Sequence, residues 1–276
     1  MSDLLVFDLD GTLLSANSTI SDYTAKVLRG LTDLGIAYTV ATGRSLHGAQ
    51  SVLKDHRFTQ PHIVKNGVLI WDPESDAYSR QCLLTQDEIA HILLAFTSAD
   101  VSPFVHTFEN GSYHGVYHSA RLKDYEQKLA AYIERERGEA VRPLNEMPPH
   151  APIANFSGLG SQHAIETIIE QIALEPHLLA YGGPAFEGRD LYWLDVHHCE
   201  GNKGAAVKEL KQQLGADRVI CFGDSDNDVT MFECADESYA PDNAKPQLLE
   251  IATGIIGHHD SDGIAHYLSQ RYGLRL

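Results

Sequence analysis

Residues 6–14 read Val-Phe-Asp-Leu-Asp-Gly-Thr-Leu-Leu, and the interpretation of the whole chain starts from this stretch. An apolar run at residues 4–7 ends in two aspartates two positions apart. Side chains alternate along a strand, so Asp8 and Asp10 leave the strand end on the same side. One carboxylate can then attack or bind a metal while the other moves a proton. A lone Asp-x-Asp turn would more simply be a solvated loop. The choice between that interpretation and a catalytic pair therefore depends on the downstream sequence.

The composition limits the classes of function. The chain has 276 residues, 43% of them hydrophobic, which suffices for one large domain or two smaller ones. The net charge of −17 and the pI near 5.2 repel nucleic acid and anionic membranes, so neither is expected as a partner. An anionic substrate would need a metal ion or local positive charge in its pocket.

The cysteines and the N-terminal residues indicate a cytoplasmic protein. No two of the four cysteines have the spacing of a zinc site or a redox pair, which is typical of core thiols in a reducing compartment. The acidic N-terminal residues do not resemble a signal peptide, and no apolar run is long enough to span a bilayer. The cysteines are Cys82, Cys199, Cys221 and Cys234.

Both ends of the chain alternate strands with helices. The Asn66-Gly67 pair between two apolar runs indicates a hairpin, and the βαβα order elsewhere predicts a parallel sheet covered by helices. Strands are expected at residues 4–7, 37–41, 62–65, 68–71, 219–222 and 254–257, and helices at 22–34, 45–53, 203–214 and 229–234.

The middle of the chain mixes hairpins with helices, which favours an α+β unit with an antiparallel sheet. A hairpin is expected around Glu109-Asn110-Gly111, and Thr85 with Glu88 predicts a capping box before a helix. The expected fold class is therefore α/β, a Rossmann-like parallel-sheet core with an inserted α+β domain. The core would comprise residues 1–80 and 188–276, and the insert residues 81–187.

Four short motifs whose residues could bind a metal ion or phosphate occur in order along the chain. They are Asp-Leu-Asp-Gly-Thr at 8–12, Thr-Gly-Arg at 42–44, Asn-Lys-Gly at 202–204, and Gly-Asp-Ser-Asp-Asn-Asp at 223–228. Three of them follow expected strands, and open α/β sheets bind ligands at the carboxyl ends of their strands. The Lys203 stretch instead opens a helix, where backbone donors favour anions.

These groups together suit phosphoryl transfer. Asp8, Asp10 and Asp224 supply the hard oxygen ligands that magnesium prefers. Thr42 offers a hydroxyl, and Lys203 offers a point charge for phosphate. A magnesium ion, phosphate donors and a free carboxylate are the parts that phosphoryl transfer requires.

The four stretches resemble motifs one to four of the haloacid dehalogenase superfamily of phosphatases. The insert resembles the cap of its Cof-type branch, subclass IIB, which includes sugar-phosphate phosphatases. The third stretch, residues 200–204, lacks the apolar residue that often precedes the motif lysine and looks closer to the sucrose-phosphatase pattern. The resemblance implies a Mg²⁺-dependent phosphomonoester hydrolase that acts on small phosphorylated metabolites such as sugar phosphates.

The resemblance also implies a role for each residue. Asp8 would be the nucleophile that forms an aspartyl-phosphate, and Asp10 would protonate the leaving oxygen and later deprotonate the attacking water. The metal ligands would be the Asp8 carboxylate, the Asp10 carbonyl and Asp224. Asp228 would orient metal-bound water rather than touch the metal. Apart from the resemblance, Arg44 follows the threonine motif and is interpreted simply as pairing with a nearby carboxylate. The implied phosphate ligands are Leu9, Thr42, Gly43, Lys203 and Asn227.

Several residues also have simpler interpretations. Thr42 alone would be a helix cap, and Lys203 alone would be a surface lysine. Asp226, His197 and His198 are interpreted as structural. Four residues of the insert could either contact the leaving group or fill the core of the insert: Phe104, His106, His114 and Tyr117.

Two other functions are compatible with the same motifs. A phosphosugar mutase or phosphotransferase would form the same intermediate and pass the phosphoryl group to a second hydroxyl. A non-catalytic sensor on the same fold would have lost part of the site, and here every expected group is present. The sequence leaves the particular substrate, the choice between hydrolysis and transfer, and the oligomeric state open.

Overall fold

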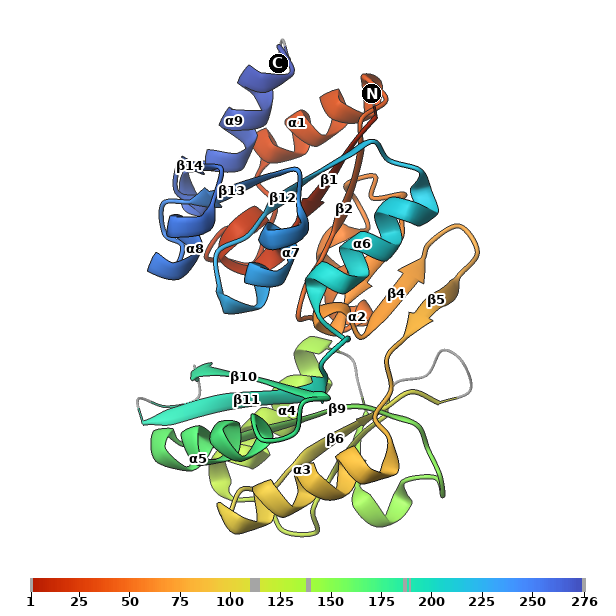
Figure 1. Ribbon diagram of the computed structural model, residues 1–276, viewed down its shortest axis with the longest axis vertical. Helices are drawn as coiled ribbons and strands as arrows, with labels where there is room; N and C mark the ends of the chain where they lie inside the picture. The colour runs from red at the N-terminus through yellow and green to blue at the C-terminus, as the bar shows by residue number, and fades with distance from the viewer. Residues whose placement is uncertain (1, 110–114, 138–139, 186–187, 189, 275–276) are drawn as a thin grey trace. The chain divides into compact units, whose positions relative to one another are not determined.

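The chain divides into two compact units (Figure 1). The computed structural model describes residues 2–109, 115–137, 140–185, 188 and 190–274. One unit, the core, comprises Met1–Arg80 and Asn202–Leu276, and the other, the insert, comprises Gln81–Gly201. The second boundary lies after Gly201 rather than at residue 187, because the strand Leu191–His198 pairs with two strands of the insert.

The core unit contains a five-stranded sheet in which every neighbouring pair is parallel. The strands β1 and β12 are central and almost wholly apolar, as expected where helices cover both faces of a sheet. Strand β13, which lies between β14 and β12, was not expected, because its residues Glu-Ser-Tyr-Ala-Pro form no apolar run. The order is β14 (Gly254–Ile256), β13 (Glu237–Pro241), β12 (Arg218–Phe222), β1 (Asp3–Phe7) and β2 (Ala37–Val40).

Helices cover both faces of this sheet (Figure 1). Apolar residues of α6, α7 and α8 pack on one face, against side chains such as Leu4 and Val6 of β1. Helices α1 and α9 pack against each other on the other face. Ser21 and Ser45 are the N-caps of α1 and α2, since the side chain of each accepts a backbone N–H. The helices are α1 (Asp22–Asp33), α2 (Leu46–Leu53), α6 (Lys203–Leu214), α7 (Val229–Cys234), α8 (Pro246–Ile251) and α9 (Gly263–Arg271).

A hairpin follows α2, as the Asn-Gly pair predicted. Strands β3 (His62–Val64) and β4 (Leu69–Asp72) are antiparallel, and β5 (Ala77–Gln81) extends this small sheet. All three turn residues, Lys65–Gly67, have positive φ. At Gly67, a Cβ would lie 2.2 Å from the carbonyl oxygen of Asn202, so only glycine fits there.

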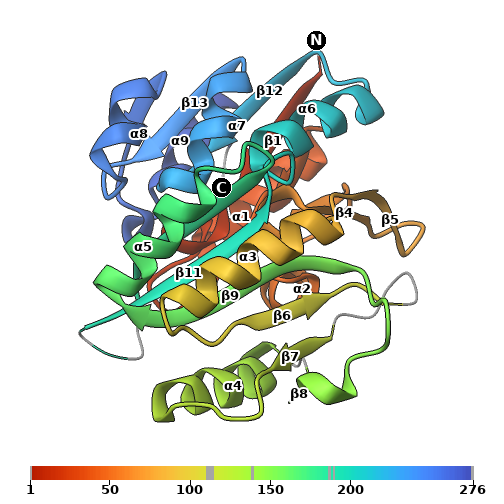
Figure 2. The ribbon, with the colours of Figure 1, turned by 60° about the horizontal axis from the view of Figure 1, so that its bottom comes forward.

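The insert contains a six-stranded, mostly antiparallel sheet. Helices α3 (Gln86–Ser98) and α5 (Gln162–Ile172) pack side by side on one of its faces (Figure 2). The capping box of Thr85 and Glu88 is confirmed. The antiparallel pair β6–β7 is also confirmed, although residues 110–114 of its turn lie outside the described residues. The strand order is β10 (Leu178–Pro184), β11 (Leu191–His198), β9 (Ile153–Ser161), β6 (Phe104–Thr107), β7 (Val116–His118) and β8 (Val141–Pro143).

The third helix of the insert, α4 (Asp124–Arg137), packs differently. Its Ile133 contacts Phe104 and Val116 at the β6–β7 end of the sheet.

Among the described residues, no helix is both long enough and apolar enough to cross a membrane.

The close approach at Gly67 predicts a large loss of stability on substitution. Gly67→Ala would force a Cβ onto the backbone of Asn202 in addition to imposing positive φ on alanine. We expect a loss of at least about 3 kcal/mol in the free energy of unfolding, measured by urea denaturation.

Gly35→Ala is the matched control for this substitution. Gly35 also has positive φ, but a Cβ there would meet nothing within 4 Å. The control should therefore lose only about 1–2 kcal/mol. Equal losses for the two variants would contradict the packing of the turn against Asn202.

Candidate functional site

The four motifs of the sequence analysis meet at the carboxyl edge of the core sheet. Asp8 directly follows β1, and its amide donates to the Phe222 carbonyl at the end of β12, 2.8 Å away. Thr42 comes two residues after β2, and Asp224 two residues after β12. Because the strands are parallel, these ends lie together, as the sequence predicted.

A buried lysine connects two of these loops. Lys203 is the first residue of α6, and its Nζ lies 2.6 Å from Asp8 Oδ1 and 2.7 Å from Asp228 Oδ1. The side chain has no solvent exposure, so it is not a surface lysine. The next residue, Gly204, allows α6 to approach α7, since a Cβ there would lie 2.2 Å from the Thr230 carbonyl oxygen.

The clustered charges shift one another's pKa. Burial alone would lower the pKa of Lys203, but the carboxylates of Asp228 and Asp8 outweigh it and raise that pKa. Burial raises the pKa of Asp8 well above its ordinary value, and the charges of Asp228 and Asp224 add to the rise against the opposing effect of Lys203. Burial and then the neighbouring Asp228 raise the pKa of Asp224 to about 6. One lysine therefore does not balance three carboxylates.

The three carboxylates lie close enough to share one ion. Asp8, Asp224 and Asp228 each offer an oxygen, and these atoms lie within 4.8 Å of one another. Hard oxygen ligands around uncompensated negative charge suit a divalent cation such as Mg²⁺. The donor set therefore fits the metal that the sequence implied.

Asp228 also holds the Asp224 loop. Its Oδ2 accepts the backbone N–H groups of Asp224 and Ser225, at 2.9 and 3.0 Å, and its Oδ1 accepts from Lys203. A Cβ on Gly223 would lie 2.5 Å from the Asp228 carboxyl carbon, so glycine is required there. Both oxygens thus have protein partners, and the contact with metal-bound water that the resemblance implied stays a prediction.

The Gly11-Thr12 pair of the opening stretch supports Asp224. Gly11 has a φ of +74°, and a Cβ there would lie 2.5 Å from Asp224 Oδ2. Thr12 Oγ1 donates to Asp224 Oδ1 at 3.1 Å, and Asn243 donates to the Gly11 carbonyl at 2.8 Å. The turn after Asp8 therefore fixes a carboxylate more than 200 residues away in the sequence.

Asp10 lies apart from the carboxylate cluster. Its two oxygens accept from Arg44 Nε at 2.8 Å and Nη2 at 2.5 Å, and its side chain is 56% exposed. The Arg44 amide donates to Thr42 Oγ1 at 3.1 Å. The bidentate geometry orients the Asp10 carboxylate, and Arg44 pairs with a nearby carboxylate as expected.

Asn66 joins two of the implied phosphate-binding stretches. Its Oδ1 accepts from Asn227 Nδ2 at 2.9 Å, and it lies 3.0 Å from where a Cβ of Gly43 would be. The sequence interpretation used Asn66 only as a turn signal and missed this contact. The turn conformation, with φ of +57° at Asn66, places the side chain between the two stretches.

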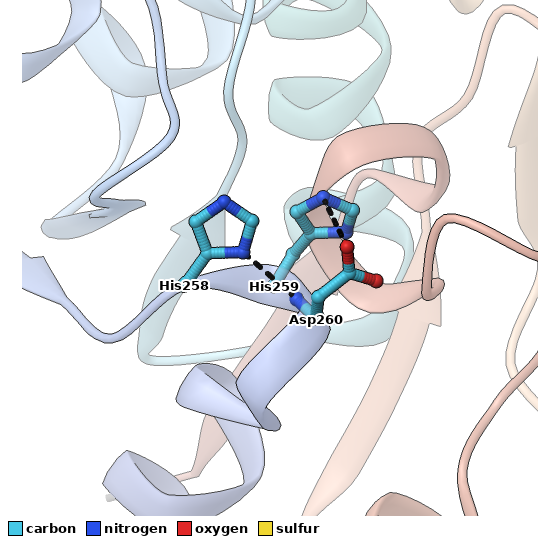
Figure 3. Close-up of side chains that lie close together, drawn as sticks. All are labelled: His258, His259 and Asp260. Carbon is cyan, nitrogen blue, oxygen red and sulfur yellow. Dashed lines mark hydrogen bonds and ion pairs between the residues drawn. The ribbon is translucent and has the colours of Figure 1, made fainter.

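A second polar cluster, His258–His259–Asp260, anchors the segment that follows the Asp8 turn (Figure 3). His259 Nδ1 donates to the Leu14 carbonyl at 2.8 Å, and Asp260 Oδ1 accepts the Ala16 amide at 2.7 Å. His258 Nδ1 accepts the Asp260 amide at 3.2 Å. The cluster thus holds residues 14–16 in place. Sequence reasoning missed it, and the His-His-Asp run was its only signal.

The four candidate specificity residues of the insert have different surroundings. Phe104 and Tyr117 are buried in the apolar clusters of the insert. These two residues therefore fill the core of the insert, which is the second of the two interpretations given above. His106 Nε2 lies 2.7 Å from Ser157 Oγ on the neighbouring strand. His114 lies outside the described residues.

Comparisons with known proteins show the family to which the chain belongs. A family model described as haloacid dehalogenase-like hydrolase matches residues 5–268. An HMP-PP phosphatase of Escherichia coli is 28% identical over 98% of this chain and 95% of its own. A 5-amino-6-(5-phospho-D-ribitylamino)uracil phosphatase of Bacillus subtilis is 24% identical over 98% of both chains.

Solved structures share the whole fold. A haloacid dehalogenase-like hydrolase from Bacteroides thetaiotaomicron has a TM-score of 0.79 at 22% identity and covers 98% of this chain and 100% of its own. A subclass IIB sugar phosphatase has a TM-score of 0.78 at 20% identity and covers 99% of both. The family match spans both ends of the chain and the insert. The chain therefore belongs to the haloacid dehalogenase-like hydrolase family and is a phosphatase.

Proposed function

We propose that this phosphatase is a Mg²⁺-dependent phosphomonoester hydrolase that acts on small phosphorylated metabolites such as sugar phosphates. The observation that carries the proposal is the buried contact between Lys203 and Asp8 beside Asp224, at the carboxyl edge of the core sheet. In this proposal Asp8 is the nucleophile, Lys203 is the cation for the phosphate and Asp224 is a carboxylate for the metal.

Asp8 is the residue proposed to accept the phosphoryl group. It is 5% exposed, and Lys203 holds one of its oxygens. Attack of the carboxylate on phosphorus would form an acyl phosphate and release the leaving oxygen. The same ammonium would remain close to the phosphoryl oxygens, where negative charge gathers in the transition state.

Asp10 is proposed to move the proton. The leaving oxygen needs a proton, and the water that later attacks the acyl phosphate must lose one. The half-exposed Asp10 carboxylate can reach solvent and is oriented by Arg44. A carboxyl oriented in this way can serve both steps, first as the acid and then as the base.

Asp8 and Asp224 would hold the magnesium ion, together with the Asp10 carbonyl. When bound, the ion would neutralise the clustered carboxylates and polarise the phosphoryl oxygens. Thr42, Asn227 and the amides of Leu9 and Gly43 would position the phosphate. The relatives support a small-molecule substrate, since their names specify HMP-PP, a ribitylaminouracil phosphate and sugars.

Asp8→Asn should abolish turnover. The amide cannot attack phosphorus, so we expect kcat to fall at least about 1,000-fold with p-nitrophenyl phosphate and Mg²⁺. Asp226→Asn is the control, because Asp226 is a half-exposed aspartate that pairs with Lys245, and its turnover should stay within about twofold. Unchanged turnover in the Asp8 variant would disprove the assignment of the nucleophile.

Lys203→Met should reduce both stability and activity. It would leave the buried carboxylates of Asp8 and Asp228 without their cation, at a cost of about 3–5 kcal/mol in metal-free protein. Lys211→Met removes an exposed ion pair with Asp236 and should cost about 1 kcal/mol or less. Urea denaturation in EDTA measures both variants, and equal losses would contradict the role of the buried lysine.

The raised pKa of Asp224 predicts how stability depends on pH in metal-free protein. Its folded pKa of about 6 exceeds the ordinary value of 3.8, so the folded state binds the proton more tightly. The stabilisation is complete below about pH 4 and is lost as the pH rises through 6, by at most about 3 kcal/mol. Denaturation in EDTA from pH 4 to 7 should show this slope, and Asp224→Asn should reduce it to the part that other groups such as Asp8 contribute. A variant with the wild-type slope would refute the prediction.

A further inference from the structure

The His258–His259–Asp260 cluster carries ligand atoms that the phosphatase chemistry does not use. It lies within the core unit and is a different group from the carboxylates around Asp8. One ring nitrogen of each histidine and one carboxylate oxygen of Asp260 lie within 4.8 Å of one another. The two rings are adjacent, with centroids 4.8 Å apart, and the Asp260 carboxylate lies next to the His259 ring (Figure 3). Three side chains that can ligate a metal ion therefore meet at one place.

His259 is held in the way that is typical of a metal-binding histidine. Its Nδ1 lies 2.8 Å from the Leu14 carbonyl oxygen, which can only accept, so Nδ1 carries the hydrogen and Nε2 of the neutral ring has a lone pair. Histidines that bind metals almost always donate their other ring N–H to a carbonyl, a carboxylate or water, which fixes the tautomer and the direction of the ring. The His259 side chain is only 13% exposed, so packing also restricts its rotation.

Asp260 divides its two carboxylate oxygens between the protein backbone and the cluster. Its Oδ1 accepts the Ala16 amide at 2.7 Å, and its Oδ2 lies 3.8 Å from His259 Nε2. Two ligands that each bind the same ion at about 2.1 Å stand about 3–4 Å apart. The Asp260 side chain is 42% exposed, so an ion can enter from solvent.

His258 supplies a third lone pair. Its Nδ1 accepts the Asp260 amide at 3.2 Å, so Nδ1 carries no hydrogen in the neutral ring. The Nδ1 edge of this ring is turned toward Asp260 (Figure 3). The bond is at the long end of the normal range for an amide donor and is open to solvent. A metal ion at Nδ1 would replace it, and the amide would then bond to water.

Two imidazoles and one carboxylate select a different class of metal from the carboxylates around Asp8. Imidazole nitrogen suits Zn²⁺, Cu²⁺ and Ni²⁺, whereas Mg²⁺ prefers oxygen ligands. Three protein ligands also leave a coordination position for water. The net charge of −17 attracts cations of both classes, so the ligand atoms make the distinction between the two places.

We propose that His258 Nδ1, His259 Nε2 and Asp260 Oδ2 form a second metal site, which binds Zn²⁺ or a related divalent transition metal ion. The site goes beyond the proposed phosphatase function and does not depend on it. Two of its ligands also hold the backbone of residues 14–16, which follow the Asp8 turn. The bound ion therefore fixes this segment more firmly and stabilises the core unit.

Zinc binding to the purified protein in excess Mg²⁺ tests the site, because Mg²⁺ competes for the carboxylates around Asp8. Equilibrium dialysis should show one Zn²⁺ per chain, bound in the micromolar range. Cu²⁺ in its place should give an electron paramagnetic resonance spectrum with nitrogen splitting from imidazole, which a site of carboxylates alone cannot produce. Binding only at millimolar Zn²⁺ would indicate an adventitious surface ion and overturn the proposal, as would a spectrum without nitrogen splitting.

Two variants separate metal binding from the anchoring hydrogen bonds. His259→Asn places an amide N–H where Nδ1 stands, so it keeps the donor to Leu14 and loses Nε2. Asp260→Asn keeps an oxygen to accept the Ala16 amide and replaces Oδ2 by an NH₂ group. Each variant should bind Zn²⁺ at least about tenfold more weakly, since even the loss of an outer-shell partner costs that much. In EDTA, both should unfold at nearly the urea midpoint of the wild type.

His198→Asn is the matched control, because His198 also belongs to a pair of histidines beside a carboxylate. Its ring centroid lies 6.3 Å from that of His177, and its Nε2 lies 3.5 Å from Glu88 Oε1. This variant should bind Zn²⁺ as the wild type does. Micromolar Zn²⁺ should raise the urea midpoint of the wild type and of this control, but not of the two cluster variants. An equal rise in all four proteins would mean that the cluster only anchors the chain, and the proposal would be wrong.

Discussion

The contact of the Lys203 ammonium with two buried carboxylates is the constraint on which the core unit depends. It joins the start of α6 to the loops after β1 and β12, and these two loops are more than 200 residues apart in the sequence. A buried pair of this kind is strongly destabilised when one partner is removed. The chain therefore needs Gly204 and Gly223, because any Cβ at those positions would push α6 or the Asp228 loop out of place.

Much of the core could be predicted from the sequence, because its signals are local. Apolar runs and the Asn-Gly turn each predict one element, and the parallel topology follows from the alternation of strands and helices. Strand β13 was missed because its burial comes from pairing with β12 rather than from its own composition. The end of the insert was placed too early, because nothing local to residues 188–201 distinguishes a strand of the insert from a strand of the core.

The candidate site was predictable to the level of residue type but not of contact. The motif aspartates, Thr42 and Lys203 carry their chemistry in their identity and order. The contacts of Asn66, Asn243 and His259 are set by tertiary packing, and a single sequence contains no record of them. The buried acceptor atoms of Asn155 and His197, which have no partner among the described residues, lie on adjacent strands, and the sequence alone does not give that register.

The central claim is that Asp8 becomes phosphorylated during turnover. Enzyme mixed with ³²P-labelled substrate and Mg²⁺, and quenched in acid within milliseconds, can be reduced with borohydride, which converts an aspartyl-phosphate into homoserine. The account predicts label on the protein before reduction and homoserine at position 8 in the peptide mass spectrum afterwards. Turnover without labelled protein, or label on another residue, would contradict it.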